Sequence, residues 1–380
     1  MILLLASLAM IFYVWVAYPL ILVLLSLIGR LFSNIKYNYR DSELSVTVIV
    51  AAHNEESSIS KRINNIFDAD YEKDLVSVIV VSDGSIDNTN KICKEYCEKH
   101  SSFKLIEIDV QQGRSNAHNI ALLSCESDIV IFTDAETIFE RDTIKNLSMP
   151  FSDKNIGFVS GELRYLNQKK TKITQSASIY WKYEKFLRKL ESELRLFVFG
   201  TGACCAVRRK LYKPIPLTGD IDFTTPLDVV LQGYICISQN VAIAWDEMPD
   251  TQKKEFKSRV RMTSKNLYGT IARWGVLGVF KYPAYSFVIF SHKIGRWLTP
   301  FAMIGVFVGS LLVPNNLFIF LLLVAQFLFY SLAVFGYYRF PFPLSGLIYS
   351  FCLTNIGFFI GVMKAITGQV PQAYKPINKV

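Results

Sequence analysis

Charged residues are missing from three long stretches of this 380-residue sequence. Residues 2–29, 297–338 and 340–363 contain none, although 19% of the whole sequence is charged. A helix that crosses a bilayer needs roughly 20 apolar residues, and one Arg or Lys at its centre costs about 2.5–3.5 kcal/mol on insertion scales. The first stretch therefore predicts one membrane span, the second stretch two spans and the third stretch one more.

A secretory signal peptide is the alternative interpretation of the first stretch. Its apolar core is too long for a signal peptide, and no small-residue cleavage site precedes Arg30. We therefore expect a retained anchor over residues 1–30. Arg30, Lys36 and Arg40 follow it directly, and an excess of basic residues beside a span marks the cytoplasmic side. This pattern predicts a multi-pass protein of the cell (inner or plasma) membrane whose soluble part faces the cytosol.

Three common site signatures are also absent. The seven cysteines form no C-x-x-C pair and no histidine stands at a zinc-ligand spacing, so a metal–thiolate site is not expected. No G-x-x-x-x-G-K-[ST] occurs. The segment GTGACC (200–205) follows a helical pattern and lacks the last small residue of a dinucleotide fingerprint. The sequence therefore excludes a P-loop and the common dinucleotide-binding turn.

Strand and helix patterns alternate in the water-soluble part, whose length suits one medium α/β domain. Four apolar runs are predicted strands: SVTVIVAA (45–52), VSVIVVSD (76–83), KLIEID (104–109) and DIVIFTDA (128–135). Helical patterns separate them, which predicts a mostly parallel sheet with helices on its faces.

Acidic clusters follow three of these strands. They read HNEE (53–56), SDGSIDNT (82–89) and TDAET (133–137). Any one of them could be an ordinary loop, and Asp87 could cap a helix. Ligands of parallel sheets bind at the carboxyl ends of the strands, so the three together favour a shared site.

These segments and three later ones occur in the order of a known family. The later segments are YWKYE (180–184), GTGACCAVRR (200–209) and DIDFTTPLDVVLQGY (220–234). The ordered set resembles the membrane-bound family 2 glycosyltransferases, relatives of cellulose, hyaluronan and poly-N-acetylglucosamine synthases. The resemblance covers nearly the whole soluble part. It implies a GT-A-type (Rossmann-like) domain between N-terminal and C-terminal transmembrane helices, and inverting transfer of a sugar from a nucleotide-sugar, with a UDP-sugar as the expected donor.

The resemblance assigns the donor and metal sites. Asp134 and Glu136 occupy the D-x-D position that holds Mg²⁺ or Mn²⁺ on the diphosphate, and oxygen ligands suit such hard cations. Glu136 stands where Asp is commoner, and it can ligate directly or through water. Arg114 stands where a lysine is frequent and is expected to face the phosphates. The implied donor-binding residues are Ala51, His53, Glu55, Asp83, Arg114 and Asp134. His118, in the same segment as Arg114, is expected to be a packed helix histidine.

Direct inversion also needs a base for the acceptor hydroxyl. By its spacing to Gly233 and Tyr234, Asp222 matches the family's catalytic aspartate. Asp220 is the rival, and Asp228 is expected on the surface of the following helix.

Acceptor binding is implied for a second set of residues: Tyr180, Trp181, Glu184, Gly202 and Arg261. Tyr180 or Trp181 could stack on a sugar or simply pack in the core. Processive synthases carry Q-x-x-R-W, whereas SRVRM (258–262) keeps only Arg261 of that motif. TIARW (270–274) looks like a displaced copy that we treat as unrelated. Long-polymer synthesis therefore competes with the addition of one or a few sugars.

The predicted organisation has five parts. They are an anchor (1–30), a cytosolic GT-A domain (41–270), interfacial helices (271–297), about three C-terminal spans (298–364) and a tail (365–380). The expected partners are the nucleotide-sugar, a lipid-linked saccharide or growing polysaccharide, and membrane lipids, but no nucleic acid. The net charge of +9 suits phosphates and anionic headgroups, or a plain solvated surface. Two alternatives remain: transfer directly to polyprenyl phosphate, and a non-catalytic membrane scaffold or transport component.

Overall fold

Eight strands form one sheet in the part of the chain that the computed structural model describes, which is residues 1–32, 44–167, 172–247, 251–313, 316–338, 340 and 342–371. The strands are β1 Val46–Ala52, β2 Val76–Asp83, β3 Phe103–Ile108, β4 Ile129–Asp134, β5 Ile138–Phe139, β6 Ile156–Tyr165, β7 Cys205–Arg208 and β8 Ile235–Asp246. Their order across the sheet is β3-β2-β1-β4-β7-β6-β8-β5.

The first half of the sheet is parallel, as the sequence predicts. β3, β2, β1 and β4 are parallel neighbours, and each begins and ends within one residue of its predicted range. β7 then pairs antiparallel with both β4 and β6, while β6 and β8 are parallel and β5 is antiparallel to β8. The whole sheet is therefore mixed, with the acid-ending strands β2, β1 and β4 side by side.

Helices cover both faces of this sheet. They include α3 Ile59–Phe67, α4 Thr89–Lys99, α5 Arg114–Leu123, α6 Thr143–Ser148 and α8 Ile221–Leu231. On β1, Val48 and Val50 belong to one buried cluster with α3, whereas Ile49 belongs to another with α5 and α8. Burial on both sides explains why the strands are continuous apolar runs instead of alternating ones.

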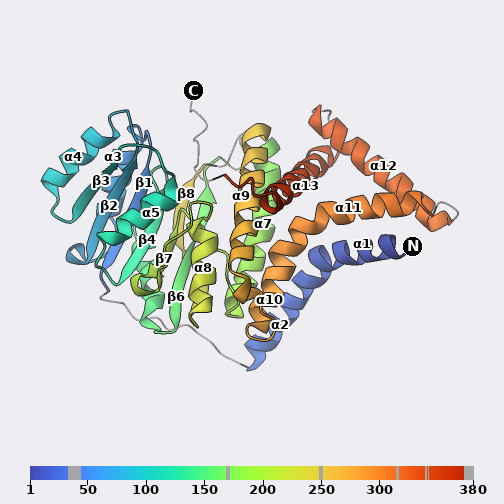
Figure 1. The fold of residues 1–380 in the computed structure, drawn as a ribbon, viewed down its shortest axis with the longest axis horizontal. Helices are drawn as coiled ribbons and strands as arrows, with labels where there is room; N and C mark the ends of the chain where they lie inside the picture. Colours follow the sequence, from blue (N-terminus) through green and yellow to red (C-terminus); the bar gives the residue numbers. More distant parts are fainter. Residues whose placement is uncertain are drawn as a thin grey trace.

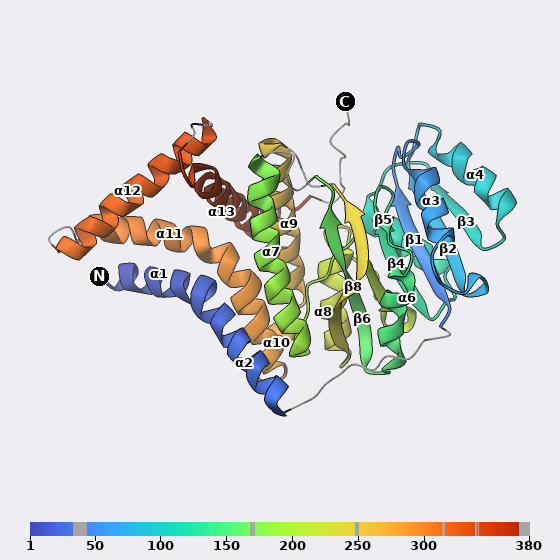
Figure 2. The ribbon, with the colours of Figure 1, turned by 180° about the vertical axis from the view of Figure 1, so that it is seen from behind.

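Two long helices separate the sheet from the apolar helices (Figures 1 and 2). They are α7 Lys172–Glu193 and α9 Gln252–Ala272. The core on the α5 and α8 side continues into the terminal helices, because Trp297 and Phe358 belong to the same buried cluster as Phe132 of β4. The domain and the apolar helices thus share one hydrophobic core.

Within the described ranges, four helices are long and apolar enough to cross a membrane: Ile2–Arg30, Pro283–Leu311, Leu317–Tyr337 and Ser345–Ile366. Three of them lie in the C-terminal part, the number expected from the sequence. The first of these three begins well before residue 298, so much of the segment 271–297 that was predicted as interfacial belongs to a long helix. His292, Lys293 and Arg296 therefore lie within the helix Pro283–Leu311, so this candidate span contains charged residues.

The two longest apolar helices are both bent, and the two bends are in contact. Ile2–Arg30 consists of α1 Ile2–Phe12, a π-helical turn and α2 Tyr18–Phe32, and Pro283–Leu311 consists of α10 Pro283–Val288, a second π turn and α11 Gly295–Leu311. Both change direction at these turns (Figure 2). Tyr13 and Ser291 share a 2.7 Å hydrogen bond there. Inserted π turns are an ordinary cause of sharp bends in helices and occur often at functional places.

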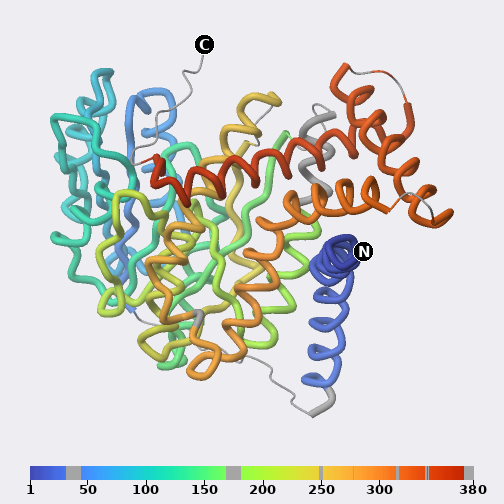
Figure 3. The backbone as a smooth tube through the Cα atoms, turned by 45° about the vertical axis from the view of Figure 1, so that its right-hand side comes forward, coloured from blue at the N-terminus to red at the C-terminus, as the bar shows by residue number. Residues whose placement is uncertain are grey.

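The last apolar helix packs on the soluble part. The helix α13 Ser345–Ile366 crosses α9 (Figure 3). A Cβ added at Gly361 would lie 2.5 Å from the Cβ of Thr263, and one at Gly357 would lie 2.9 Å from that of Arg259. Glycine at these two positions lets the two helices approach closely.

Candidate active site

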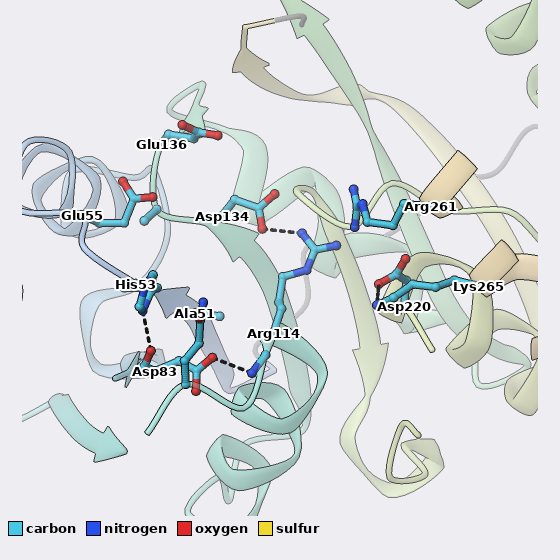
Figure 4. A pocket seen from close by; sticks show the side chains of 14 residues that line it. Ala51, His53, Glu55, Asp83, Arg114, Asp134, Glu136, Asp220, Arg261 and Lys265 are labelled. Carbon is cyan, nitrogen blue, oxygen red and sulfur yellow. Dashed lines mark hydrogen bonds and ion pairs between the residues drawn. The ribbon is translucent and has the colours of Figure 1, made fainter. Parts of the chain in front are cut away.

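A cavity of about 200 Å³ opens at the carboxyl ends of β1, β2 and β4 (Figure 4). Its lining includes eight residues that the sequence assigned to the site: Ala51, His53, Glu55, Asp83, Arg114, Asp134, Glu136 and Arg261. Ala52, Gln111, Gly113, Ala135, Asp220 and Lys265 complete it. The acidic clusters of three strands therefore do face one common space.

Asp83 holds the loop that leads into α5. Its Oδ1 accepts a hydrogen bond from the backbone N–H of Gln112 at 2.8 Å and its Oδ2 accepts one from Gly113 at 2.6 Å. Gly113 has a φ of 99°, a value that side chains other than hydrogen disfavour. Since Arg114 follows directly, Asp83 fixes the backbone from which that arginine reaches into the cavity.

His53 and Glu55 are fixed by the neighbouring strand and helices. His53 Nδ1 lies 2.6 Å from the backbone oxygen of Asp83, and Glu55 Oε2 accepts a 2.5 Å hydrogen bond from Ser58. The backbone N–H of Glu55 donates to Thr89 Oγ1 at 2.8 Å. These bonds join β1, β2, α3 and α4 at one end of the cavity.

The candidate metal ligands lie at the end of β4. Asp134 Oδ1 accepts a 2.7 Å hydrogen bond from Arg114 Nη1, whereas Glu136 is exposed on the turn that follows (Figure 4). Asp134 raises the pKa of the Arg114 guanidinium. Among the described residues, no three His, Cys, Asp or Glu side chains are grouped as a metal site. Two carboxylates completed by phosphate oxygens and water are nevertheless an ordinary set for Mg²⁺, so the pair fits a cation that arrives with a diphosphate.

A third acid near this pair was missed. Burial raises the pKa of Asp246, at the end of β8, to about 7, and the charges of Asp134 and Glu136 contribute to the shift. Asp246 does not line the cavity. No motif in the sequence pointed to it, because its position depends on how β8 enters the sheet.

Lys265 was also missed. Its Nζ donates to Asp220 Oδ1 at 3.1 Å, and both side chains are buried at the cavity wall. Burial acts to raise the pKa of Asp220, but Lys265 and Arg261 outweigh it and leave that pKa lowered. Lys265 stands four residues after Arg261 on α9, a spacing that puts two side chains on the same helix face. That spacing was the available signal.

Asp222 follows Asp220 by two residues, in the first turn of α8, and is half-buried. It is not part of the cavity wall as the described residues define it. A Cβ added at Gly202 would lie 3.2 Å from Arg114 Nη2 and 3.5 Å from the carboxyl carbon of Asp222, so Gly202 sits against both. Burial raises the pKa of Asp222 and the charge of Asp220 raises it further. A raised pKa makes this carboxylate a stronger base.

Asp228 is not on the surface, and that prediction was wrong. Its side chain is buried and accepts two hydrogen bonds from Arg273, at 2.7 and 2.8 Å. Nearly every side of α8 is covered, so this residue faces the end of α9 instead of solvent. Arg273, from the segment TIARW, thus has a structural partner.

Trp181 of α7 lines a second, smaller hollow together with Lys185, Arg188 and Thr201. The Arg188 guanidinium lies 5.7 Å from the Trp181 ring centre. This tryptophan therefore faces polar groups, while other apolar residues of α7 pack on α2. The side chain of Tyr180 lies outside the described part of the chain.

Glu184 lines neither of these spaces. It is buried, and its carboxylate accepts hydrogen bonds from Lys293 and Arg296 at 2.5 Å each, from His292 at 3.2 Å and from Arg188 at 3.3 Å. Burial acts to raise the pKa of Glu184, but these cations hold it well below its usual range. Glu184 therefore links α7 to the helix Pro283–Leu311, and the structure brings it to no acceptor space.

His118 is a packed histidine, as expected. It is buried on α5 with its ring centre 4.8 Å from that of Phe132. Burial lowers its pKa to about 3, and Arg114 adds to the effect. Its ring is therefore neutral at physiological pH.

Comparisons with known proteins agree on the family. The model of the family described as Glycosyl transferase family 2 matches residues 47–215. A probable glycosyltransferase, YdaM, of Bacillus subtilis is 27% identical over 235 residues, which are 59% of this chain and 55% of that protein. An N-acetylglucosaminyltransferase of Azorhizobium caulinodans is 27% identical over 177 residues, 46% of this chain and 43% of that protein. This chain thus spans about half the length of the curated relatives it matches.

One solved structure has the same overall fold. It is the mannosyltransferase PcManGT of Pyrobaculum calidifontis, in complex with GDP-Man and Mn²⁺, with a TM-score of 0.72 at 20% identity. The match covers 97% of this chain and 99% of that chain, apolar helices included. The predicted fold, a GT-A-type α/β domain flanked by apolar helices, is confirmed. Residues 47–215 of this chain are thus similar to the Glycosyl transferase family 2 domain.

Proposed function

We propose that the protein is a membrane-anchored, metal-dependent, inverting glycosyltransferase. It moves a sugar from a nucleotide-sugar, with a UDP-sugar as the expected donor, to a lipid-linked saccharide or growing polysaccharide. The observation that carries this proposal is the cavity at the ends of β1, β2 and β4, where two candidate metal ligands and cationic side chains are assembled. The candidate base, Asp222, lies outside the cavity wall, beside Gly202. The family match and the relatives named as glycosyltransferases support it.

The donor is expected to lie along the cavity with its nucleoside toward His53, Glu55 and Asp83. Its diphosphate then faces the cationic side chains of Arg114 and Arg261, which balance its charge. Asp134 and Glu136 would hold Mg²⁺ or Mn²⁺, which supplies Lewis-acid stabilisation of the leaving diphosphate. The solved relative that binds GDP-Man and Mn²⁺ supports both parts of this arrangement.

Asp222 is the proposed base. Its carboxylate takes the proton of the acceptor hydroxyl while the hydroxyl oxygen bonds to the anomeric carbon and the bond to the diphosphate breaks. One displacement at that carbon inverts its configuration. The raised pKa of Asp222 suits proton removal, and Gly202, with no side chain, leaves space between this carboxylate and Arg114.

The hollow beside Trp181 is the proposed entrance for the acceptor. An aromatic ring flanked by Lys185 and Arg188 suits the face of a sugar and an adjoining anionic group. The same two cations keep direct transfer to polyprenyl phosphate as the second candidate. A non-catalytic scaffold is disfavoured, because Asp83, Asp134, Glu136 and Asp222 are all present around the cavity.

The proposed topology places the domain in the cytosol, with residues 1–30 as an anchor that starts outside. The four candidate spans support a membrane location. Residues 372–380 of the tail lie outside the described part. The side of the membrane on which the tail lies follows only from the number of membrane spans.

The test uses membranes that contain the full chain and a panel of radiolabelled UDP- and GDP-sugars, with and without EDTA. We expect transfer from one donor, loss of transfer in EDTA and recovery with Mn²⁺ or Mg²⁺. Asp222→Asn should lower kcat about 10²–10⁴-fold. Turnover that EDTA leaves unchanged would refute the metal assignment, and full turnover of Asp222→Asn would refute the base.

A further inference from the structure

One of the two candidate metal ligands already has a cationic partner. Arg114 Nη1 donates to Asp134 Oδ1 at 2.7 Å, and both side chains are about one-third exposed, at 30% and 29%. The bond crosses the cavity from α5 to the end of β4 (Figure 4). A metal that binds Asp134 therefore meets a carboxylate whose charge is already compensated.

The backbone of Arg114 is fixed, whereas its side chain is partly exposed and lines the cavity. Asp83 holds the preceding amides, as described above, and α5 starts at Arg114. Gly202 lies beside the guanidinium, where an added Cβ would be 3.2 Å from Nη2. The side chain can thus change partner by rotation alone, without moving α5.

We propose that Arg114 is an exchangeable counter-charge for Asp134. In the empty cavity it pairs with Asp134, and when the donor enters it turns to the diphosphate and releases the carboxylate to the metal. This inference rests on the proposed function. It adds that binding of the two ligands is coupled: the metal binds weakly alone and tightly together with the nucleotide.

The coupling follows from charge balance. A divalent cation at Asp134 has to displace the guanidinium, which would then lose its charge-assisted hydrogen bond. A nucleotide diphosphate offers the guanidinium another anion, so the displacement costs less when the donor is present. Coupling between two ligands is reciprocal, so the metal must also tighten binding of the nucleotide by the same factor.

The experiment measures Mn²⁺ binding directly, by the EPR signal of free Mn²⁺, on the full chain in detergent. Titrations are made without nucleotide and with saturating UDP or GDP, after subtracting Mn²⁺ held by the nucleotide in a protein-free control. For the unmodified chain we expect the dissociation constant of Mn²⁺ to fall about tenfold or more when the matching nucleotide is added.

Arg114→Met should strengthen Mn²⁺ binding without nucleotide and reduce the gain in Mn²⁺ affinity that nucleotide brings. Without nucleotide, Mn²⁺ should bind about tenfold tighter than to the unmodified chain, because no guanidinium competes for Asp134. The gain from added nucleotide should shrink to about threefold or less. Arg209→Met is the control, since it removes an exposed arginine that does not line the cavity. It should leave Mn²⁺ binding and the gain from nucleotide unchanged.

The exchange is refuted if Arg114→Met binds Mn²⁺ no tighter than the unmodified chain, or if both variants keep the same gain from nucleotide. If the methionine variant fails to fold, Arg114→Lys, which retains a cation, is measured in the same Mn²⁺ titrations. If the unmodified chain binds no Mn²⁺ in the presence of nucleotide, or binds it equally in Asp134→Asn, the metal site of the proposed function fails and the exchange fails with it. If binding depends on Asp134 but not on Arg114, only the exchange fails.

Discussion

Replacing Glu184 by glutamine is expected to destabilise the protein strongly. Glu184 is 2% exposed and supplies the negative charge between Lys293 and Arg296, each 2.5 Å away. Glutamine has the same shape and still accepts hydrogen bonds, but it carries no charge. The substitution therefore leaves two buried cations without their shared counter-charge.

Breaking a buried ion pair by removing one partner costs about 3–5 kcal/mol. The lower end, about 3 kcal/mol, is expected because the amide oxygen keeps part of the hydrogen bonding. In a domain of 150–250 residues each kcal/mol lowers the unfolding midpoint by about 2–4 °C. The apparent midpoint of Glu184→Gln in detergent should therefore fall by about 6–12 °C.

The same helix provides a matched control in Glu193. This glutamate pairs with Arg30 at 2.8 Å, but the two side chains are 29% and 62% exposed. Exposed pairs of this kind contribute about 0–1 kcal/mol, so Glu193→Gln should shift the midpoint by no more than about 4 °C. Thermal unfolding followed by tryptophan fluorescence measures both variants under one condition. Equal shifts for the two variants, or a rise for Glu184→Gln, would refute the reasoning.

Three further predictions concern the domain. Asp220→Asn removes a charge that raises the pKa of Asp222, so the acid limb of kcat/KM should move to lower pH; an unmoved limb would contradict Asp222 as the base. The wild-type protein should lose stability as pH falls from about 6.5 to about 3, partly because buried His118 resists the proton that the unfolded chain accepts. His118→Leu should lose less over that range, and parallel curves of midpoint against pH would count against this. Gly161→Ala would place a Cβ 2.3 Å from a buried thiol, so a loss of about 1–3 kcal/mol is expected in thermal unfolding, with Gly346→Ala, in open space, as the neutral control.

The parallel half of the sheet could be predicted because its signals are local. Each of β1 to β4 is a short apolar run between polar turns, and each connecting helix shows its own spacing of apolar residues. The second half could not be predicted in the same way. β7 is only four residues long, and it runs antiparallel between β4 and β6. Its place depends on partners far away in the sequence, which no local pattern encodes.

The same difference between local signals and tertiary packing applies to the residues of the candidate site. Residues at strand ends, such as Asp83 and Asp134, were found because the end of a parallel strand is a position that the sequence reveals. Lys265, which lines the cavity, and Asp246, which lies outside its lining, were missed because they belong to α9 and β8, whose packing is a tertiary property. Asp228 was misplaced for a related reason: an acid on a helix looks exposed until a distant arginine is known to cover it.

The bend of the helix Pro283–Leu311 explains why charged residues occur in this helix. His292 and Lys293 lie in its π turn and Arg296 lies in the first turn of α11, where α7 supplies the carboxylate of Glu184. The 17 residues of α11 measure about 25 Å at 1.5 Å per residue, less than the roughly 30 Å of a bilayer core. α11 alone is therefore short for a complete crossing, and the charged turn beside it lies against the domain, where the carboxylate of Glu184 compensates its cations.

From that turn a continuous series of hydrogen bonds leads to the proposed base. Glu184 accepts from Arg188, Arg188 Nη1 donates to the backbone oxygen of Gly200 at 3.1 Å, and the N–H of Gly200 donates to the backbone oxygen of Asp222 at 2.7 Å. Spatial continuity alone does not establish energetic coupling. Glu184→Gln separates the two roles. If the contact only stabilises the fold, the folded fraction of this variant keeps the wild-type kcat. If it also positions the base, kcat falls in the folded fraction while the KM for the donor stays unchanged, because Glu184 does not line the donor cavity.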